Sequence, residues 1–204
     1  MMNRKLKKSL IEYGLIGAAA LTLYLTGLHT EVIGFLQRGL LQTGLFNPDT
    51  EVTAAAAPAE NPPADFNLQL RNASGEEVHM EEFRGKVIFI NFWATWCPPC
   101  VAEMPGINSL YQDIGADEFV FLMVSLDEDF EKAVQFQKKK GYDFDVYQLD
   151  SPLPGMYRSQ SIPATFVVDA RGSLAFTHKG MADYDTEDFR SFLLSLQQKP
   201  EQDP

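Results

Sequence analysis

The sequence is poor in cysteine, histidine and tryptophan, with two Cys, three His and two Trp among its 204 residues. Cys97 and Cys100 leave no pair for a separate structural disulfide, and no cysteine near the N-terminal segment for a lipid anchor. Structural zinc sites take four Cys or His ligands, whereas His29, His79 and His178 lie far from the cysteines in the sequence. We therefore expect no metal and no other bound cofactor.

Basic residues are also scarce, because 17 Lys and Arg stand against 28 Asp and Glu, for a net charge of −11. The imbalance lies downstream, since residues 1–46 carry a net charge of +3 and the remainder carries −14. Nucleic-acid binders usually present a basic face, so no nucleic-acid partner is expected. No repeat of fixed period is present, and the length suits one ordinary domain with accessory segments.

The N-terminal segment combines a basic start with a long apolar run. Residues 1–9 include four basic residues, and residues 10–28 are mostly apolar. A helix of that length spans about 28 Å, close to the thickness of a bilayer core. Because basic residues favour the cytoplasmic side, we expect a transmembrane anchor in the lipid bilayer at 10–28 with the N-terminus inside. A cleaved signal peptide is the rival interpretation, although no small-x-small cleavage site directly follows Leu28.

Residues 29–46 predict an amphipathic juxtamembrane helix, because Val32, Leu36 and Leu40 recur every four residues. Such a helix can lie in the membrane interface or pack on the folded domain, and the sequence leaves both open. A stretch rich in Ala and Pro follows, which favours an extended spacer. The remaining predicted segments are the linker at 47–64, the folded domain at 65–198 and a tail at 199–204.

The folded domain alternates apolar runs with helical patterns. Runs without polar alternation predict strands that are buried on both faces, and strands separated by helices predict an α/β fold with a mixed central sheet. The expected strands are Val87–Trp93, Phe119–Leu126 and Thr165–Val168, the expected helices are Pro98–Ile114, Phe130–Lys140 and Thr186–Gln197, and a hairpin joins Val167–Asp169 to Leu174–His178.

The two cysteines lie where the first buried strand gives way to a helix. Pro98 suits the first helical position, where a missing N–H costs nothing. Free N–H groups and the positive helix end then face the Cys97 sulfur, which lowers its pKa below the value of about 8.5 for a free thiol. The thiolate is the attacking species in disulfide exchange. Cys100, one turn inward, is expected to be more buried and to react second.

Residues 92–100 (Phe-Trp-Ala-Thr-Trp-Cys-Pro-Pro-Cys) and the later Ser161–Thr165 (Ser-Ile-Pro-Ala-Thr) resemble the thioredoxin superfamily. The following Glu103-Met104-Pro105 makes the chain similar to the TlpA/ResA branch, whose members are membrane-tethered bacterial proteins. The resemblance covers roughly residues 65–197. It implies a thioredoxin-like fold with flanking helices, in which a helix-strand insertion matches Asp127–Asp150.

The same resemblance implies catalytic and substrate-binding residues. Cys97 matches the nucleophile and Cys100 the resolving cysteine. Pro163 matches a cis-proline, which would present the Ile162 backbone to an extended substrate as an added strand would. The residues that would shape the docking surface beside the nucleophile are Trp96, Pro98 and Pro99.

Glu103 is the third expected catalytic residue. It lies three residues beyond Cys100, on the same helix face, and in the TlpA/ResA branch the matching glutamate tunes proton transfer by the cysteines. Other thioredoxins use a buried Asp on the preceding strand, but Asn91 stands there and cannot take up a proton. Pro105 is interpreted as a structural kink in the helix, and the acidic run Asp127–Asp129 as a solvated helix start.

The leading functional hypothesis is a reductase of disulfides on the periplasmic side of a bacterial cytoplasmic membrane. The resemblance implies protein disulfide or dithiol substrates, a membrane thiol-reductant donor, and apocytochrome c as a common client. An oxidase or isomerase remains open, because the two residues between the cysteines do not decide the direction of electron flow.

The sequence leaves two other functions to be weighed. A copper chaperone would use the soft thiolates and would need a nearby His or Met, for which His178 and Met104 are candidates. A peroxidase of the peroxiredoxin type is disfavoured, because such enzymes place Thr or Ser three residues before the reactive cysteine, where this sequence has Ala94.

Overall fold

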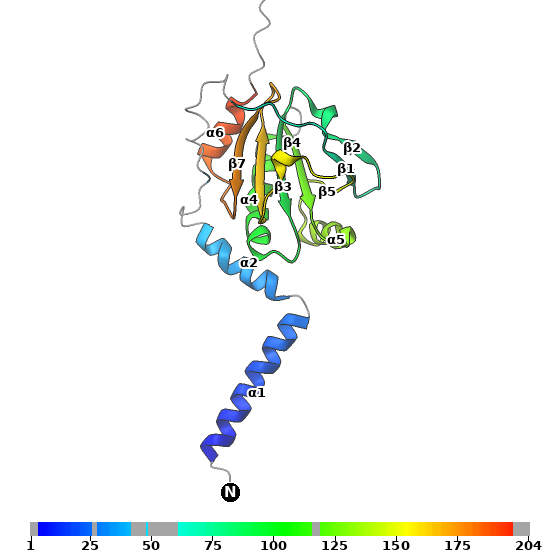
Figure 1. Ribbon diagram of the computed structural model, residues 1–204. Helices are drawn as coiled ribbons and strands as arrows, with labels where there is room; N and C mark the ends of the chain where they lie inside the picture. Colours follow the sequence, from blue (N-terminus) through cyan, green and yellow to red (C-terminus); the bar gives the residue numbers. More distant parts are fainter. Residues whose placement is uncertain (1–3, 26–27, 42–47, 49–60, 116–118, 198–204) are drawn as a thin grey trace, which may run out of the picture.

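The computed structural model describes residues 4–25, 28–41, 48, 61–115 and 119–197. Two N-terminal helices precede a domain built around a central sheet, and α1 extends away from that domain (Figure 1). The elements are α1 (Arg4–Leu25), α2 (Leu28–Leu41), β1 (Gln69–Asn72), β2 (Glu77–His79), the 3-10 turn η1 (Met80–Phe83), β3 (Val87–Trp93), α4 (Pro98–Ile114), β4 (Phe119–Ser125), α5 (Phe130–Lys140), β5 (Val146–Leu149), the 3-10 turn η2 (Gly155–Tyr157), β6 (Ala164–Val168), β7 (Leu174–Lys179) and α6 (Glu187–Ser195).

The seven strands form one mixed sheet in the order β2-β1-β5-β4-β3-β6-β7. The central strand β3 is parallel to β4 and antiparallel to β6, and β4 is parallel to β5. The expected hairpin is present as β6 and β7, with an irregularity in register between Val167 and Val168. The mixed sheet and the α/β class expected from the sequence are therefore confirmed.

The strand β3 explains why its sequence is apolar without alternation. Ile88 and Ile90 belong to the core cluster on one face of the sheet, and Phe89 and Trp93 belong to the cluster on the other. Both faces are covered, so every side chain of the strand is buried. Asn91 is the polar exception, and it lies on the same face as Phe89 and Trp93, the face covered by α4 and α6.

The helix ends follow local rules that the sequence already displays. The Asp129 carboxylate accepts a hydrogen bond from the Glu131 N–H at 3.3 Å and caps α5, which ends at Gly141 with φ 68°. A residue in this left-handed region is easiest to provide as glycine. The Thr186 hydroxyl caps α6 by accepting from the Phe189 N–H at 3.2 Å. Pro105 lies inside α4, where the sequence placed a structural proline.

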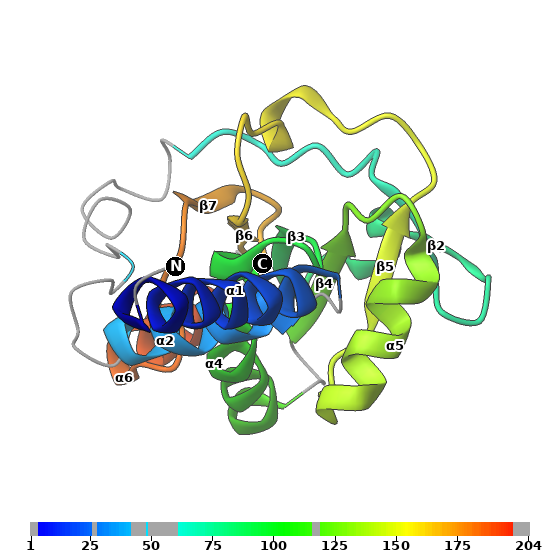
Figure 2. The ribbon, with the colours of Figure 1, turned by 90° about the horizontal axis from the view of Figure 1, so that it is seen from below.

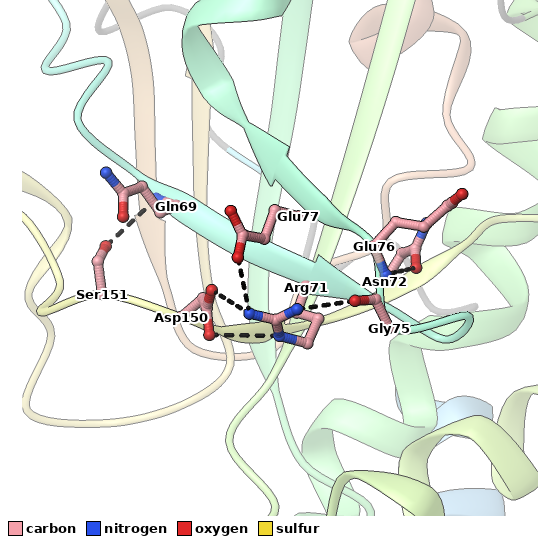
Figure 3. Close-up of polar contacts among 8 residues, drawn as sticks. All are labelled: Gln69, Arg71, Asn72, Gly75, Glu76, Glu77, Asp150 and Ser151. Carbon is pink, nitrogen blue, oxygen red and sulfur yellow. Dashed lines mark hydrogen bonds and ion pairs between the residues drawn. The ribbon is translucent and has the colours of Figure 1, made fainter.

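The hairpin β1–β2 and the short strand β5 form the edge of the sheet that the hydrophobic pattern does not reveal. The Arg71 guanidinium joins them, since it pairs with Glu77 at 3.2 Å and with Asp150 at 2.7 Å and donates to the Gly75 carbonyl at 2.7 Å (Figure 3). The helix-strand insertion implied by the resemblance is present as α5 and β5. Backbone hydrogen bonds tie residues 62–64 to residues 172–174, so the chain joins the domain slightly before residue 65.

The two N-terminal helices differ in their surroundings. Along α1 the apolar side chains Ile11, Leu15 and Leu21 are exposed. Across the described parts of the chain, no helix has the length and apolar character needed to cross a bilayer, so the anchor expected at 10–28 is not confirmed. Helix α2 packs against α4, as Figures 1 and 2 show from two directions. Most of the expected linker, the end of the juxtamembrane segment and the tail lie outside the described residues.

The aromatic cluster between the sheet and α6 is centred on Phe89, whose ring centroid lies 5.0 Å from that of Phe121 and 5.3 Å from that of Tyr184. We expect Phe89→Ala to lower the free energy of unfolding by about 3–5 kcal/mol, because it leaves a cavity in a fully packed region. Urea denaturation measures the change. The matched control Phe35→Ala removes an exposed ring and should change stability by less than about 0.5 kcal/mol. Equal effects of the two substitutions would contradict the proposed core.

Candidate active site

The two cysteines are joined by a disulfide at the start of α4. Cys97 is the N-cap residue of the helix, and its sulfur accepts a hydrogen bond from the Cys100 N–H at 3.3 Å. Both cysteines are buried, but Cys97 keeps 4% of its surface exposed and lines a surface groove, whereas Cys100 is 0% exposed and does not line it. The difference in burial agrees with the expected order of reaction, in which Cys97 meets the substrate first.

The loop before β6 lies beside the Cys97 sulfur. The Ile162–Pro163 peptide bond is cis, as the resemblance implies, and the Ile162 carbonyl oxygen is 3.8 Å from the Cys97 sulfur. A groove of about 510 Å³ opens over the disulfide. It is lined by Trp96, Cys97, Pro98, Leu126, Ser159, Gln160, Ser161 and Ile162.

The groove brings together three of the five expected substrate-binding residues: Trp96, Pro98 and Ile162. Trp96 is 59% exposed and offers a large apolar surface. Pro99 is only partly buried, Pro163 is buried, and neither lines the groove. The lining residues carry no charge, so the groove suits an uncharged stretch of an extended peptide.

Glu103 is buried one turn beyond Cys100, with 1% of its surface exposed. One carboxyl oxygen accepts from the Asn91 side-chain N–H at 2.8 Å, and the other accepts from the Ala182 backbone N–H at 3.3 Å. Both donors are neutral, and burial outweighs them, so the pKa of Glu103 rises from 4.5 to about 8. A carboxyl group with this pKa can exchange its proton near neutral pH.

The sequence pattern missed the residues that support Glu103 from other elements. Thr165 on β6 lies opposite Asn91 in register, and its hydroxyl accepts from the Asn91 side chain at 2.9 Å. Tyr184 is also buried, and burial together with the negative charge of Glu103 raises the pKa of its hydroxyl. No local motif marks these residues, because only the folded chain places them beside α4.

Asp127 was expected to be a solvated residue at a helix start, and the structure corrects that interpretation. Its carboxylate accepts from the Thr95 backbone N–H at 3.0 Å, the Thr95 hydroxyl at 2.6 Å and the Ser125 hydroxyl at 2.8 Å. Asp127 therefore fixes the loop that leads from β3 into Cys97. Only Asp129 acts as the expected helix cap.

The side chains proposed for copper binding lie on separate elements. Met104 is fully buried on α4, and His178 stands on β7 opposite Thr165. Within the residues that the structure describes, no group of three or more His, Cys, Asp or Glu side chains could hold a metal ion.

Residues 59–177 match the AhpC/TSA family. The chain belongs to this family. A thiol-disulfide oxidoreductase ResA of Geobacillus thermodenitrificans is 32% identical over 148 residues, which cover 72% of this chain and 83% of that protein. The thioredoxin-like protein YneN of Bacillus subtilis is 32% identical over 123 residues, which cover 57% of this chain and 68% of the relative.

Among solved structures, the fold is similar to that of a thiol:disulfide interchange protein DsbE from Chlorobium tepidum. The TM-score is 0.59 at 24% identity, and the match covers 70% of this chain and 100% of that one. The AhpC/TSA chain is thus a thioredoxin-like thiol–disulfide oxidoreductase of the ResA type, with a redox centre formed by its own cysteines.

The buried carboxyl of Glu103 predicts a pH-dependent stability. The folded protein keeps a proton that the unfolded chain loses, so the free energy of unfolding should fall between pH 4.5 and about 8. Glu103→Gln should remove this decline, which we expect to be on the order of a few kcal/mol. Urea denaturation of the oxidised protein across this range measures it. The control Glu128→Gln alters an exposed acid and should keep the decline; equal pH slopes in native protein and Glu103→Gln would refute the assignment.

The bonds of Asp127 predict a positioning effect. Asp127→Ala leaves the Thr95 N–H and two hydroxyl groups without their acceptor, and should cost about 1–3 kcal/mol of stability. Hydrogen exchange at the Thr95 amide should accelerate in parallel, as NMR can show. The neighbouring substitution Glu128→Ala should change neither quantity appreciably, and an equally protected Thr95 amide in Asp127→Ala would argue against the bond.

Proposed function

We propose that the domain is a disulfide reductase in which Cys97 attacks a substrate disulfide at the groove. The Cys97 thiolate forms a bond with one substrate sulfur and releases the other as a thiolate. The Cys100 thiolate then attacks the Cys97 sulfur, closes the intramolecular disulfide and releases the first substrate sulfur. Two electrons pass from the cysteine pair to the substrate, and no further oxidant or reductant takes part in this half-reaction.

The observation that carries the proposal is the position of the disulfide. Cys97 lies at the helix N-cap, in contact with an open groove, while Cys100 lies behind it and is fully buried. The N-terminal end of a helix favours a thiolate. Trp96, Pro98 and the Ile162 backbone would hold the extended substrate, and the buried Pro163 would fix the loop that carries Ile162.

Glu103 supplies the proton chemistry in this proposal. The ionised carboxylate takes the proton from Cys100 before that sulfur attacks, and the protonated form returns one when the disulfide is reduced again. A pKa of about 8 makes both forms accessible near neutral pH. Asn91 and the Ala182 N–H hold the carboxyl in place.

We also propose that this domain works on the extracytoplasmic side of a bacterial cytoplasmic membrane. The support is the basic residues at 4–8, the exposed apolar side chains of α1, and the apolar outer surface of α2. A membrane thiol donor would then return the cysteines to the reduced state. Apocytochrome c is the proposed client class, and this part of the proposal rests on the sequence resemblance to the TlpA/ResA branch.

Trapping tests the reductase mechanism. In Cys100→Ser the mixed disulfide on Cys97 cannot be resolved, so a protein disulfide substrate should remain attached, and dithiothreitol should release it. Non-reducing gels followed by mass spectrometry detect the adduct. Cys97→Ser is the matched control and should trap nothing, and similar adducts on both variants would overturn the order of attack.

The direction of electron flow needs a separate measurement. A dithiothreitol or glutathione couple gives the reduction potential of the Cys97–Cys100 pair. A potential well below that of strong oxidants supports a reductase, whereas a value near about −120 mV would assign the domain to oxidation instead.

A further inference from the structure

Helix α2 lies against the first turn of α4, which carries the redox cysteines (Figures 1 and 2). The contact is close at Gly34, where an added methyl group would lie 3.3 Å from both the Pro98 carbonyl oxygen and the Val101 side chain. Gly34, Arg38 and Leu41 share one face of α2. The inner face of α2 therefore rests on the active-site helix at a point that only glycine fits without displacement.

Beside the next turn of this contact, a half-open cavity of about 160 Å³ lies between α2, α4 and residues 182–185. Arg38 and Leu41 line it from α2, and Glu103 lines it from α4. The Arg38 Nε is buried and has no hydrogen-bond partner among the residues that the structure describes. The volume can hold several water molecules at roughly 30 Å³ each, and Arg38 and Glu103 line this one cavity from different helices.

Among the residues with described positions, the other groups around Glu103 provide no positive charge. Asn91, Thr165 and the Tyr184 hydroxyl are neutral donors or acceptors on its protein side. His178 on β7 lies opposite Thr165 of β6, and burial lowers its pKa, which favours the neutral imidazole. On the cavity side, Asp183 and Asp185 are acidic.

Asp185 already has a basic partner in Arg190, which also pairs with Asp113 at 2.9 Å. Among the described residues that line the cavity, Arg38 is the one basic side chain.

We propose that Arg38 is a positioning residue that favours the ionised form of Glu103 across the cavity, so that docking of α2 on α4 sets how readily Cys100 gives up its proton. A cation near a carboxyl favours the ionised form of that carboxyl. The inference rests on the proposed function of Glu103. It adds that the N-terminal helix belongs to the proton chemistry of the site.

The inference can be tested by following closure of the Cys97–Cys100 disulfide in the full chain, solubilised in detergent. A reduced protein treated with a thionitrobenzoate disulfide forms a mixed disulfide on Cys97, and attack by Cys100 then releases a second, coloured thiolate. In Arg38→Gln the pH at which this second step reaches half its maximal rate should rise by about one unit, which is about a tenfold loss of rate below the midpoint. Arg38→Lys keeps the charge and should restore the native midpoint.

Gly34 offers an independent variant that leaves every charge in place. A leucine side chain at this position cannot fit against Pro98 and Val101. Gly34→Leu should therefore displace α2 from α4 and raise the pH midpoint, as Arg38→Gln does. Gly39→Leu is the matched control, because Gly39 has open space around it, and it should leave the midpoint unchanged. A native midpoint in Gly34→Leu would overturn the claim that docking matters.

A second background separates an electrostatic from a structural effect. In Glu103→Gln no carboxyl can titrate, so adding Arg38→Gln should change the profile no further, whereas a structural effect would slow the double variant again. An unchanged midpoint in Arg38→Gln with normal ring closure overturns this inference and leaves the proposed function standing. Failure of the native protein to release the second thiolate would instead overturn the proposed function.

Discussion

The hydrogen bond from the Asn91 side chain to the Glu103 carboxyl joins the central strand to the active-site helix, and much of the site depends on it. The strand β3 is buried on both faces, so its end point is fixed, and it delivers Cys97 to the start of α4. At the same time Asn91 points toward α4, where it holds a carboxyl group that burial would otherwise destabilise in its charged form. Strand β3 thus fixes the position of the Cys97 sulfur and also holds the proposed proton acceptor, Glu103.

The pKa of Glu103 depends on a balance between burial and hydrogen bonding, which explains why its hydrogen-bond donors are neutral. A buried lysine or arginine in direct contact would hold the carboxylate charged and remove its capacity to exchange a proton near neutral pH. Neutral donors from Asn91 and Ala182 stabilise the charge only in part, which leaves the pKa at about 8. A cation placed across a cavity, as Arg38 is, can bias this balance without fixing it.

The sequence was sufficient for features that depend on local pattern. Strand β3, helix α4 and the β6–β7 hairpin follow from hydrophobic runs, a proline at the helix start and turn residues. The sequence was insufficient for features that tertiary contacts determine. The edge hairpin β1–β2 is short and half exposed, the solvated appearance of Asp127 hides its bonds to Thr95, and Tyr184 reaches Glu103 only through the loop before α6. The cis bond at Pro163 was predictable from the family resemblance alone.

The contact between α2 and α4 connects the attachment of the domain to its chemistry. The exposed side of α2 carries apolar residues such as Phe35 and Leu36, while its inner side lies on the turn that holds the cysteines. A helix whose outer face prefers an apolar environment is held in place by whatever that face contacts. Its inner face then fixes the walls of the cavity beside Glu103. A packed helix moves as a rigid unit. A shift of α2 therefore changes the position of Arg38 and the contact with the first turn of α4 at the same time.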